Sequence, residues 1–167
     1  DAMRRFAREA EALARLQHPG IAQVLEVGVD DGDPPRAFLV MEFVDGPDLL
    51  EFAQRLPLRR RLELFAELTD AVAHAHARGV VHRDLKPANV LVSTDGDRSR
   101  VKVLDFGVAR FIESDDDRQS LLTHTHQVIG TLAYMSPEQV TGGRIDARSD
   151  VYALGVTVFQ LLTGRLP

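Results

Sequence analysis

The feature that most constrains the fold is a pair of polar motifs separated by two short apolar runs. The first motif spans His82 to Asn89, and the second is Asp105-Phe106-Gly107. The apolar runs are Val90-Leu91-Val92 and Val101 to Leu104, with a turn-forming Asp95-Gly96-Asp97 between them. This pattern predicts two short strands joined by a tight turn, with one polar motif before the first strand and the other after the second.

The residue types in these motifs suit phosphoryl transfer. An aspartate can accept a proton, while an asparagine five residues later and a second aspartate at a strand end can hold magnesium on a nucleotide triphosphate. With Asp84, Asn89 and Asp105 in these places, the chain resembles a protein kinase. Further motifs of that family follow in order: Gly130-Thr131, Ser136-Pro137-Glu138 and Ser149 to Gly155.

The resemblance is closest to bacterial Ser/Thr protein kinases, through His-Pro-Gly-Ile-Ala-Gln at 18–23 and Arg-Ser-Asp-Val-Tyr-Ala-Leu-Gly at 148–155. It implies an α+β, protein-kinase-like fold in truncated form. We expect a single partial domain over 1–167, with the end of the small lobe and the hinge at 1–44 and most of the mainly helical large lobe at 45–167.

The resemblance also indicates which parts of the family domain lie outside this sequence. There is no Gly-x-Gly-x-x-Gly loop and no Val-Ala-x-Lys strand, and the two lysines are Lys86 and Lys102. We therefore expect a fragment that lacks the first three strands and the last helices, and we expect that fragment to be catalytically inactive by itself.

Composition narrows the class of protein. The 167 residues are 44% hydrophobic and 27% charged, with a net charge of -5 and no cysteine. The hydrophobic share is enough for one core. The absence of cysteine excludes a disulfide framework or a cysteine-based zinc site. The acidic balance argues against nucleic acid as a partner, and no apolar stretch reaches the length of a membrane span.

Hydrophobic periodicity predicts the remaining elements. Helices are expected at 2–17, at 58–78 with Gly79 as C-cap, and at 150–162, the last one apolar almost all round and therefore buried. The runs 21–29 and 37–44 read as a hairpin with a long tip. The stretch 110–133 reads as a polar loop, in which His124 and His126 are solvent-exposed rather than zinc ligands.

Catalytic roles follow from the resemblance. Asp84 is the expected base for the substrate hydroxyl, and Lys86 offsets charge on the transferred phosphoryl group. Asn89 and Asp105 are the expected magnesium ligands. Thr131 is expected to hydrogen-bond near Asp84 and Lys86 in the substrate-docking loop of a Ser/Thr enzyme.

ATP and Mg²⁺ are the cofactors that the resemblance implies. The adenine base is expected to contact the carbonyl of Glu42 and the amide of Val44, with Met41 as the gatekeeper behind it. Asp48 is expected to reach the ribose and Leu91 to form the apolar floor, although ordinary strand packing explains this spacing equally well.

Glu9, on the first helix, matches the glutamate that pairs with the strand lysine in the active state of the family, and Glu11 is its rival. Leu13, Val24, His82 and Phe106 are expected to form an apolar column between the lobes, so that His82 is a buried structural histidine. Asp150 is expected to anchor the base of this column through the backbone of the first motif.

Regulation is expected in the loop that follows Asp105. Thr123 and Thr125 are the candidate autophosphorylation sites, although an unmodified surface threonine is the simpler alternative. Arg83 would pair with the phosphate, because a guanidinium matches phosphate geometry. Phe106 reports whether Asp105 points into the site.

Two other functions stay open from the sequence. A pseudokinase scaffold would use the fold for binding only, and a small-molecule phosphotransferase would share the base and the metal ligands. The preferred interpretation has proteins that carry Ser/Thr as substrates, self-association for trans-autophosphorylation, and a cytoplasmic location, with any membrane anchor outside this sequence.

Overall fold

The computed structural model describes residues 16–33, 36–106 and 132–167. The expected helix at 2–17 lies almost wholly outside these ranges, as do most of the expected loop at 110–133 and residues Glu9, Leu13, Thr123, Thr125 and Thr131. In chain order the described elements are β1 (Val24–Val29), β2 (Ala37–Met41), α2 (Leu49–Ala53), α3 (Leu58–His76), the 3-10 turn η1 (Pro87–Asn89), β3 (Val90–Asp95), β4 (Arg98–Val103), α7 (Pro137–Val140) and α8 (Ala147–Thr163).

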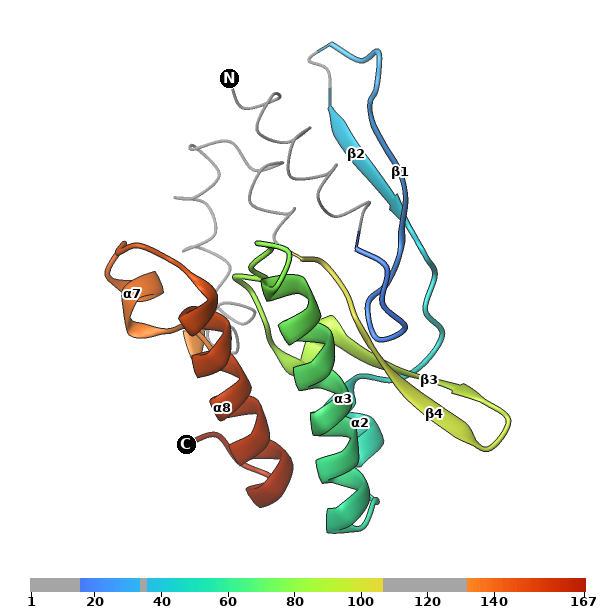
Figure 1. Ribbon diagram of the computed structural model, residues 1–167, viewed down its shortest axis with the longest axis vertical. Helices are drawn as coiled ribbons and strands as arrows, with labels where there is room; N and C mark the ends of the chain where they lie inside the picture. The colour runs from blue at the N-terminus through green and yellow to red at the C-terminus, as the bar shows by residue number, and fades with distance from the viewer. Residues whose placement is uncertain (1–15, 34–35, 107–131) are drawn as a thin grey trace.

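Two antiparallel hairpins and four α-helices, of which α3 and α8 are the long ones, make up the described fold (Figure 1). The β1–β2 hairpin lies at one end, and β3–β4 lies against α2 and α3. The helices α3 and α8 pack side by side. This α+β arrangement agrees with the fold class expected from the sequence.

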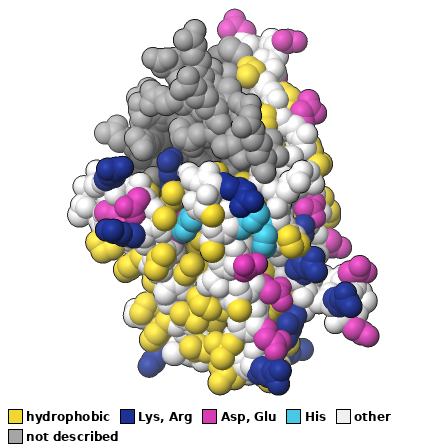
Figure 2. All heavy atoms as spheres, viewed as in Figure 1, with side chains coloured by type: hydrophobic (Ala, Val, Ile, Leu, Met, Phe, Trp, Pro, Cys, Tyr) yellow, Lys and Arg dark blue, Asp and Glu magenta, His cyan; other side chains and the backbone are white. Residues whose placement is uncertain are grey.

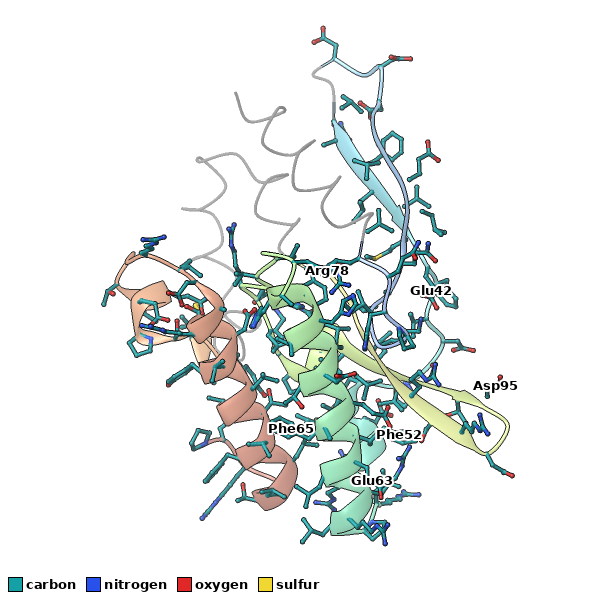
Figure 3. All side chains as sticks on the ribbon, in the orientation of Figure 1. Glu42, Phe52, Glu63, Phe65, Arg78 and Asp95 are labelled. Carbon is teal, nitrogen blue, oxygen red and sulfur yellow. The ribbon has the colours of Figure 1, made fainter. Side chains whose placement is uncertain are left out.

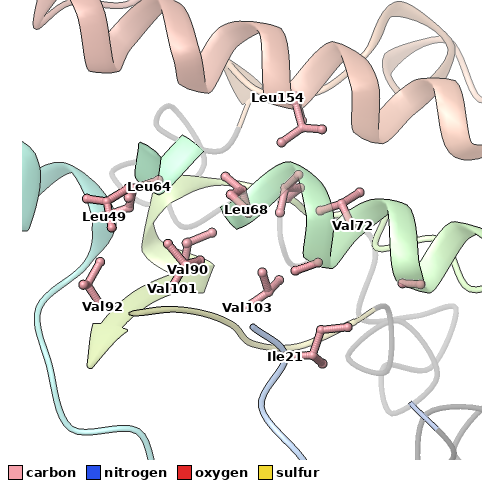
Figure 4. Close-up of a cluster of buried hydrophobic side chains, with 14 of the residues drawn as sticks. Ile21, Leu49, Leu64, Leu68, Val72, Val90, Val92, Val101, Val103 and Leu154 are labelled. Carbon is pink, nitrogen blue, oxygen red and sulfur yellow. The ribbon is translucent and has the colours of Figure 1, made fainter. Parts of the chain in front are cut away.

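The core forms where the β3–β4 hairpin meets α3. Successive side chains of a strand point to opposite faces, so every second residue of each strand enters the core. Valines of β3 and β4 are fully buried there against leucines of α2 and α3 and against Leu154 of α8 (Figure 4). The fully buried members are Leu49, Leu64, Leu68, Ala71, Ala75, Val90, Val92, Val101 and Val103.

The first hairpin is shorter than the sequence predicted. β1 begins at Val24 rather than residue 21, because Val103 pairs with the preceding segment: its amide donates to Gly20 O at 2.8 Å, and its carbonyl accepts from Ala22 N at 2.9 Å. β2 ends at Met41 rather than residue 44, since the chain then turns away and leaves Phe43 88% exposed. The backbone of β4 thereby joins the two hairpins.

Helix α3 confirms the predicted long packed helix, although its end lies earlier than residue 78. The C-cap is Ala77, and Gly79 follows at a φ of +77° with its amide bonded to His76 O. The prediction of Gly79 as the C-cap is therefore wrong: Gly79 lies two residues beyond the cap, where its left-handed backbone favours glycine.

Helix α8 corrects one prediction. It spans Ala147–Thr163, but it is not buried all round: Val151 is 60% exposed and Leu162 is 45% exposed, while Ala153 and Leu161 are buried. Among the described elements α8 packs extensively only on α3, so its opposite face meets solvent. Figure 2 shows hydrophobic side chains gathered on the face where these two helices lie.

Candidate active site

A buried carboxylate fixes the backbone of the first motif. Asp150, which is 1% exposed in α8, accepts hydrogen bonds from His82 N and Arg83 N, both at 2.8 Å. A ring nitrogen of His76 lies 2.7 Å from the same carboxylate. Arg83 adopts a φ of +69°, which is costly for a residue with a side chain, and the paired bonds to Asp150 hold it there. The expected anchoring role of Asp150 is confirmed.

Two polar side chains of the motif, those of Lys86 and Asn89, contact Asp84. Lys86 Nζ donates to Asp84 Oδ2 at 3.0 Å, and Asn89 Nδ2 donates to the backbone oxygen of Asp84 at 2.8 Å. The side chain of Asp84 remains 44% exposed, so an incoming group can reach it. The structure therefore brings together the expected catalytic residues Asp84, Lys86 and Asn89, whereas Thr131 lies outside the described residues.

His82 sits directly beneath this group as a structural residue. It is fully buried, its Nε2 lies 2.8 Å from Leu104 O, and its Nδ1 accepts from Asp84 N at 3.3 Å. The neutral ring with a proton on Nε2 satisfies both bonds. Its ring packs against Phe106 with centroids 4.8 Å apart, which confirms this contact of the expected apolar column.

Burial lowers the pKa of His82 below its usual value. The charge of Asp150, the Leu104 carbonyl, and the carboxylates of Asp84 and Asp105 all act in the opposite direction without overcoming it.

Asp105 follows β4 at the point where the strand leaves the hairpin. Leu104 N donates to Asn89 O at 2.9 Å, so the second motif is bonded to the first through the backbone. Asp105 itself has a φ of +52° and is exposed. It lines a hollow together with Met41 and Phe106, whereas Asp84 lines a separate hollow together with Arg83 and Asp150.

The expected nucleotide residues lie around the link between the two hairpins. Met41 ends β2, Glu42 N donates to Gln23 O at 2.8 Å, and Val44 follows as a half-buried residue of the linker to α2. Asp48 forms an isolated bridge with Leu91, and its carboxylate caps α2 by accepting from Glu51 N at 2.9 Å. The contacts of these residues with adenine and ribose stay predictions.

The donor set fits magnesium. Because both bonds from Asn89 to Asp84 use the amide nitrogen, the amide oxygen of Asn89 is left to face other groups. An amide oxygen and the exposed carboxylate of Asp105 are oxygen ligands of the kind that Mg²⁺ prefers. The assignment of Asn89 and Asp105 as magnesium ligands stays a prediction.

Sequence reasoning missed three interactions of the site. Gln139 Nε2 donates to Arg83 O, and its Oε1 accepts from Ser136 N at 3.0 Å, so this side chain ties the Ser136 segment to the motif backbone. The spacing Ser136-x-x-Gln139 is a capping-box signal that could have revealed half of this link. Nothing local in the sequence indicates the bond of His76 to Asp150 or the ion pair of Lys102 with Glu42, because the partners are far apart in the chain.

Sequence comparisons match this chain to protein kinases over its whole length. The model of the protein kinase domain matches residues 1–167. The Ser/Thr-protein kinase PrkC of Bacillus subtilis is 40% identical over 99% of this chain and 24% of its own length. The Ser/Thr-protein kinase pkn3 of Myxococcus xanthus is 45% identical over 98% of this chain and 30% of its own length. The chain thus spans less than a third of these curated relatives.

Solved structures agree. The PknI kinase domain of Mycobacterium tuberculosis aligns with a TM-score of 0.72 and 33% identity, over 99% of this chain and 58% of that one. Rad53 in complex with AMP-PNP aligns with a TM-score of 0.71 and 31% identity, over 97% of this chain and 38% of that one. With its motifs, its fold and these matches in agreement, the chain belongs to the protein kinase family, as part of a domain like those of bacterial Ser/Thr kinases.

Proposed function

We propose that this chain is part of an ATP-dependent Ser/Thr protein kinase, which transfers the γ-phosphoryl group of ATP to hydroxyl groups of proteins. The observation that carries the proposal is the cluster of Asp84, Lys86 and Asn89 on a backbone anchored by Asp150. Residues 1–44 would belong to the small lobe and hinge, and residues 45–167 to the large lobe.

The chemistry assigned to each side chain is modest, because phosphoryl transfer depends mainly on positioning and charge. Asp84 accepts a hydrogen bond from the substrate hydroxyl and takes its proton as the oxygen attacks. Lys86, already 3.0 Å from Asp84, offsets negative charge on the transferred group. Asn89 and Asp105 would hold Mg²⁺, which would supply positive charge to offset that of the ATP phosphates.

The other nucleotide and regulatory roles belong to the same proposal. Met41, Glu42, Val44, Asp48 and Leu91 would form the adenine and ribose site, and Glu9 would pair with a lysine of the active state. Phosphorylation of Thr123 and Thr125 in trans, by a second copy of the protein, would then be recognised by the guanidinium of Arg83. Thr131 would dock the substrate beside Asp84.

Location is proposed on chemical grounds. No helix among the described residues is long and apolar enough to cross a membrane. ATP is the cosubstrate of the cytoplasm, and a chain without cysteine has no need of an oxidising compartment. We therefore place the kinase domain in the cytoplasm.

A phosphoryl-transfer assay on the longer protein tests the function. With radiolabelled ATP and Mg²⁺, we expect label on Ser and Thr of a generic acceptor protein and none on a panel of small alcohols and amino sugars. Label on small molecules alone would identify a metabolite phosphotransferase, and ATP binding without any transfer would identify a binding module.

Intact-mass spectra of the same protein test the regulatory part. The wild type is expected to carry phosphate on Thr123 and Thr125, and Asp84→Asn is expected to carry none, because autophosphorylation needs the base. Equal phosphate counts in the two proteins would contradict the assignment of these threonines as autophosphorylation sites.

A further inference from the structure

An ion pair holds the linker between β2 and α2 against the β3–β4 hairpin. Lys102 Nζ, in β4, lies 2.7 Å from Oε1 and 2.8 Å from Oε2 of Glu42. The lysine side chain is 16% exposed and the glutamate 35%, so solvent screens this pair less than one on the open surface. Figure 3 places Glu42 between the two hairpins.

A second set of bonds locks Glu42 to the other side. Its amide donates to Gln23 O at 2.8 Å, and its Oε2 accepts from Gln23 N at 3.2 Å, which closes a reciprocal pair with the residue just before β1. Burial tends to raise the pKa of Glu42, but the hydrogen bonds from Lys102 and Gln23 and the charge of Lys102 lower it overall. The carboxylate is therefore ionised at neutral pH and bridges β4 to the start of β1.

The ion pair lies on the hairpin face that carries Leu91. Lys102 and Leu91 are directly opposite each other in the β3–β4 register, and opposed side chains of an antiparallel pair share a face. The other face is the buried core face of Val90, Val92, Val101 and Val103. The linker also approaches β3 closely, because Val92 N donates to Pro47 O and a Cβ on Gly46 would meet Val92 O at 2.1 Å.

From this geometry we infer that Lys102 is a positioning residue for nucleotide binding. It acts through Glu42, whose backbone carbonyl is the proposed acceptor of a hydrogen bond from the adenine base. The ion pair fixes the position of that carbonyl relative to Leu91. This inference rests on the proposed function, because the hinge role of Glu42 belongs to it. Lys102 touches neither the nucleotide nor the reacting atoms.

The test measures ATP affinity, KM for ATP and kcat in the longer protein. Lys102→Met removes the charge and keeps the length of the side chain. Because the variant loses one partly buried ion pair, we expect ATP binding to weaken and KM for ATP to rise about fivefold, while kcat stays within about twofold of the wild type. Lys102→Arg is expected to restore both values. Arg60→Met is the matched control, since Arg60 holds the other end of the same strand through Ser99 O and Oγ at 3.0 and 2.7 Å.

The outcomes separate this inference from the proposed function. ATP affinity unchanged in Lys102→Met, or lowered equally in Arg60→Met, would overturn the positioning role, because the effect would then be absent or merely structural. A wild type that binds ATP but transfers no phosphoryl group would contradict the proposed function. The ATP affinities of the wild type and Lys102→Met would then still decide the role of Lys102. A wild type that binds no ATP would overturn both.

Discussion

At the scale of single residues, the site depends on two buried groups that take no part in the proposed chemistry. Asp150 accepts bonds from the backbone of His82 and Arg83, and His82 links Asp84 N to Leu104 O. The bonds of Asp150 to His82 and Arg83, and of His82 to Leu104 O, join segments far apart in the sequence, whereas the bond of Asp84 N to His82 is local. The exposed carboxylates of Asp84 and Asp105 are thus positioned by neighbours that are themselves fully enclosed.

His82 predicts a specific dependence of stability on pH. Its pKa in the folded protein lies below the unfolded value of about 6.5, so between these two values only the unfolded chain binds the extra proton. The free energy of unfolding is therefore complete above about pH 6.5 and falls as the pH drops below it, by at most about 1.4 kcal/mol per pH unit from this group.

Urea denaturation at pH 7.5 and pH 5.5 measures this effect. In His82→Phe, which keeps an aromatic ring beside Phe106 but cannot titrate, the loss of stability between the two pH values should be smaller than in the wild type. An identical loss in both proteins would mean that other groups carry the whole dependence.

Asp150→Asn is predicted to destabilise the fold by about 3 kcal/mol. Asparagine offers one acceptor oxygen in place of two, so its NH₂ group would face one of the backbone N–H donors of His82 and Arg83 and leave it without an acceptor. Asp146→Asn is the matched control: Asp146 caps the same helix through Arg148 N, and asparagine caps equally well. Thermal unfolding of both variants checks this. Equal shifts in the two would show that Asp150 is no stronger an anchor than an exposed cap.

At the scale of elements, the sequence predicted which segments are helices and strands better than where they end. The 3.6-residue period gave α3, and the apolar runs around Asp95-Gly96-Asp97 gave β3 and β4. The predicted start of β1 was wrong because Val103 pairs with Gly20 and Ala22, a long-range contact without a local signal. The predicted end of β2 was wrong because the chain turns away after Met41. The buried fraction of α8 was overestimated because an apolar composition does not say which faces have partners.

The packing of α3 on the second hairpin predicts a large asymmetry between two leucines of one helix. Leu68→Ala should lower the free energy of unfolding by about 2–5 kcal/mol, since Leu68 is fully buried in the core. Leu62→Ala, at a position that is 44% exposed, should cost less than about 1 kcal/mol. Denaturant titrations of the two variants compare them, and similar costs would contradict the core assignment.

At the scale of the whole molecule, short-range motifs predicted the chemistry and long-range contacts built the site. Asp84, Lys86 and Asn89 were identifiable because they lie within a few residues of one another. The links from α3, α7 and α8 through His76, Gln139 and Asp150 cross large sequence separations, and of these only the anchoring role of Asp150 was expected, through the family resemblance. The family assignment rests on both kinds of observation together.

The most direct test of the central claim is the rate of phosphoryl transfer by Asp84→Asn in the longer protein, with ATP affinity measured alongside. We predict a fall of at least about a hundredfold in rate with ATP affinity unchanged, because a general base contributes that much to the transfer step. Asp95→Asn, in the exposed turn of the second hairpin, should keep the full rate. A rate for Asp84→Asn within about twofold of the wild type would contradict the assignment of this cluster as the catalytic site.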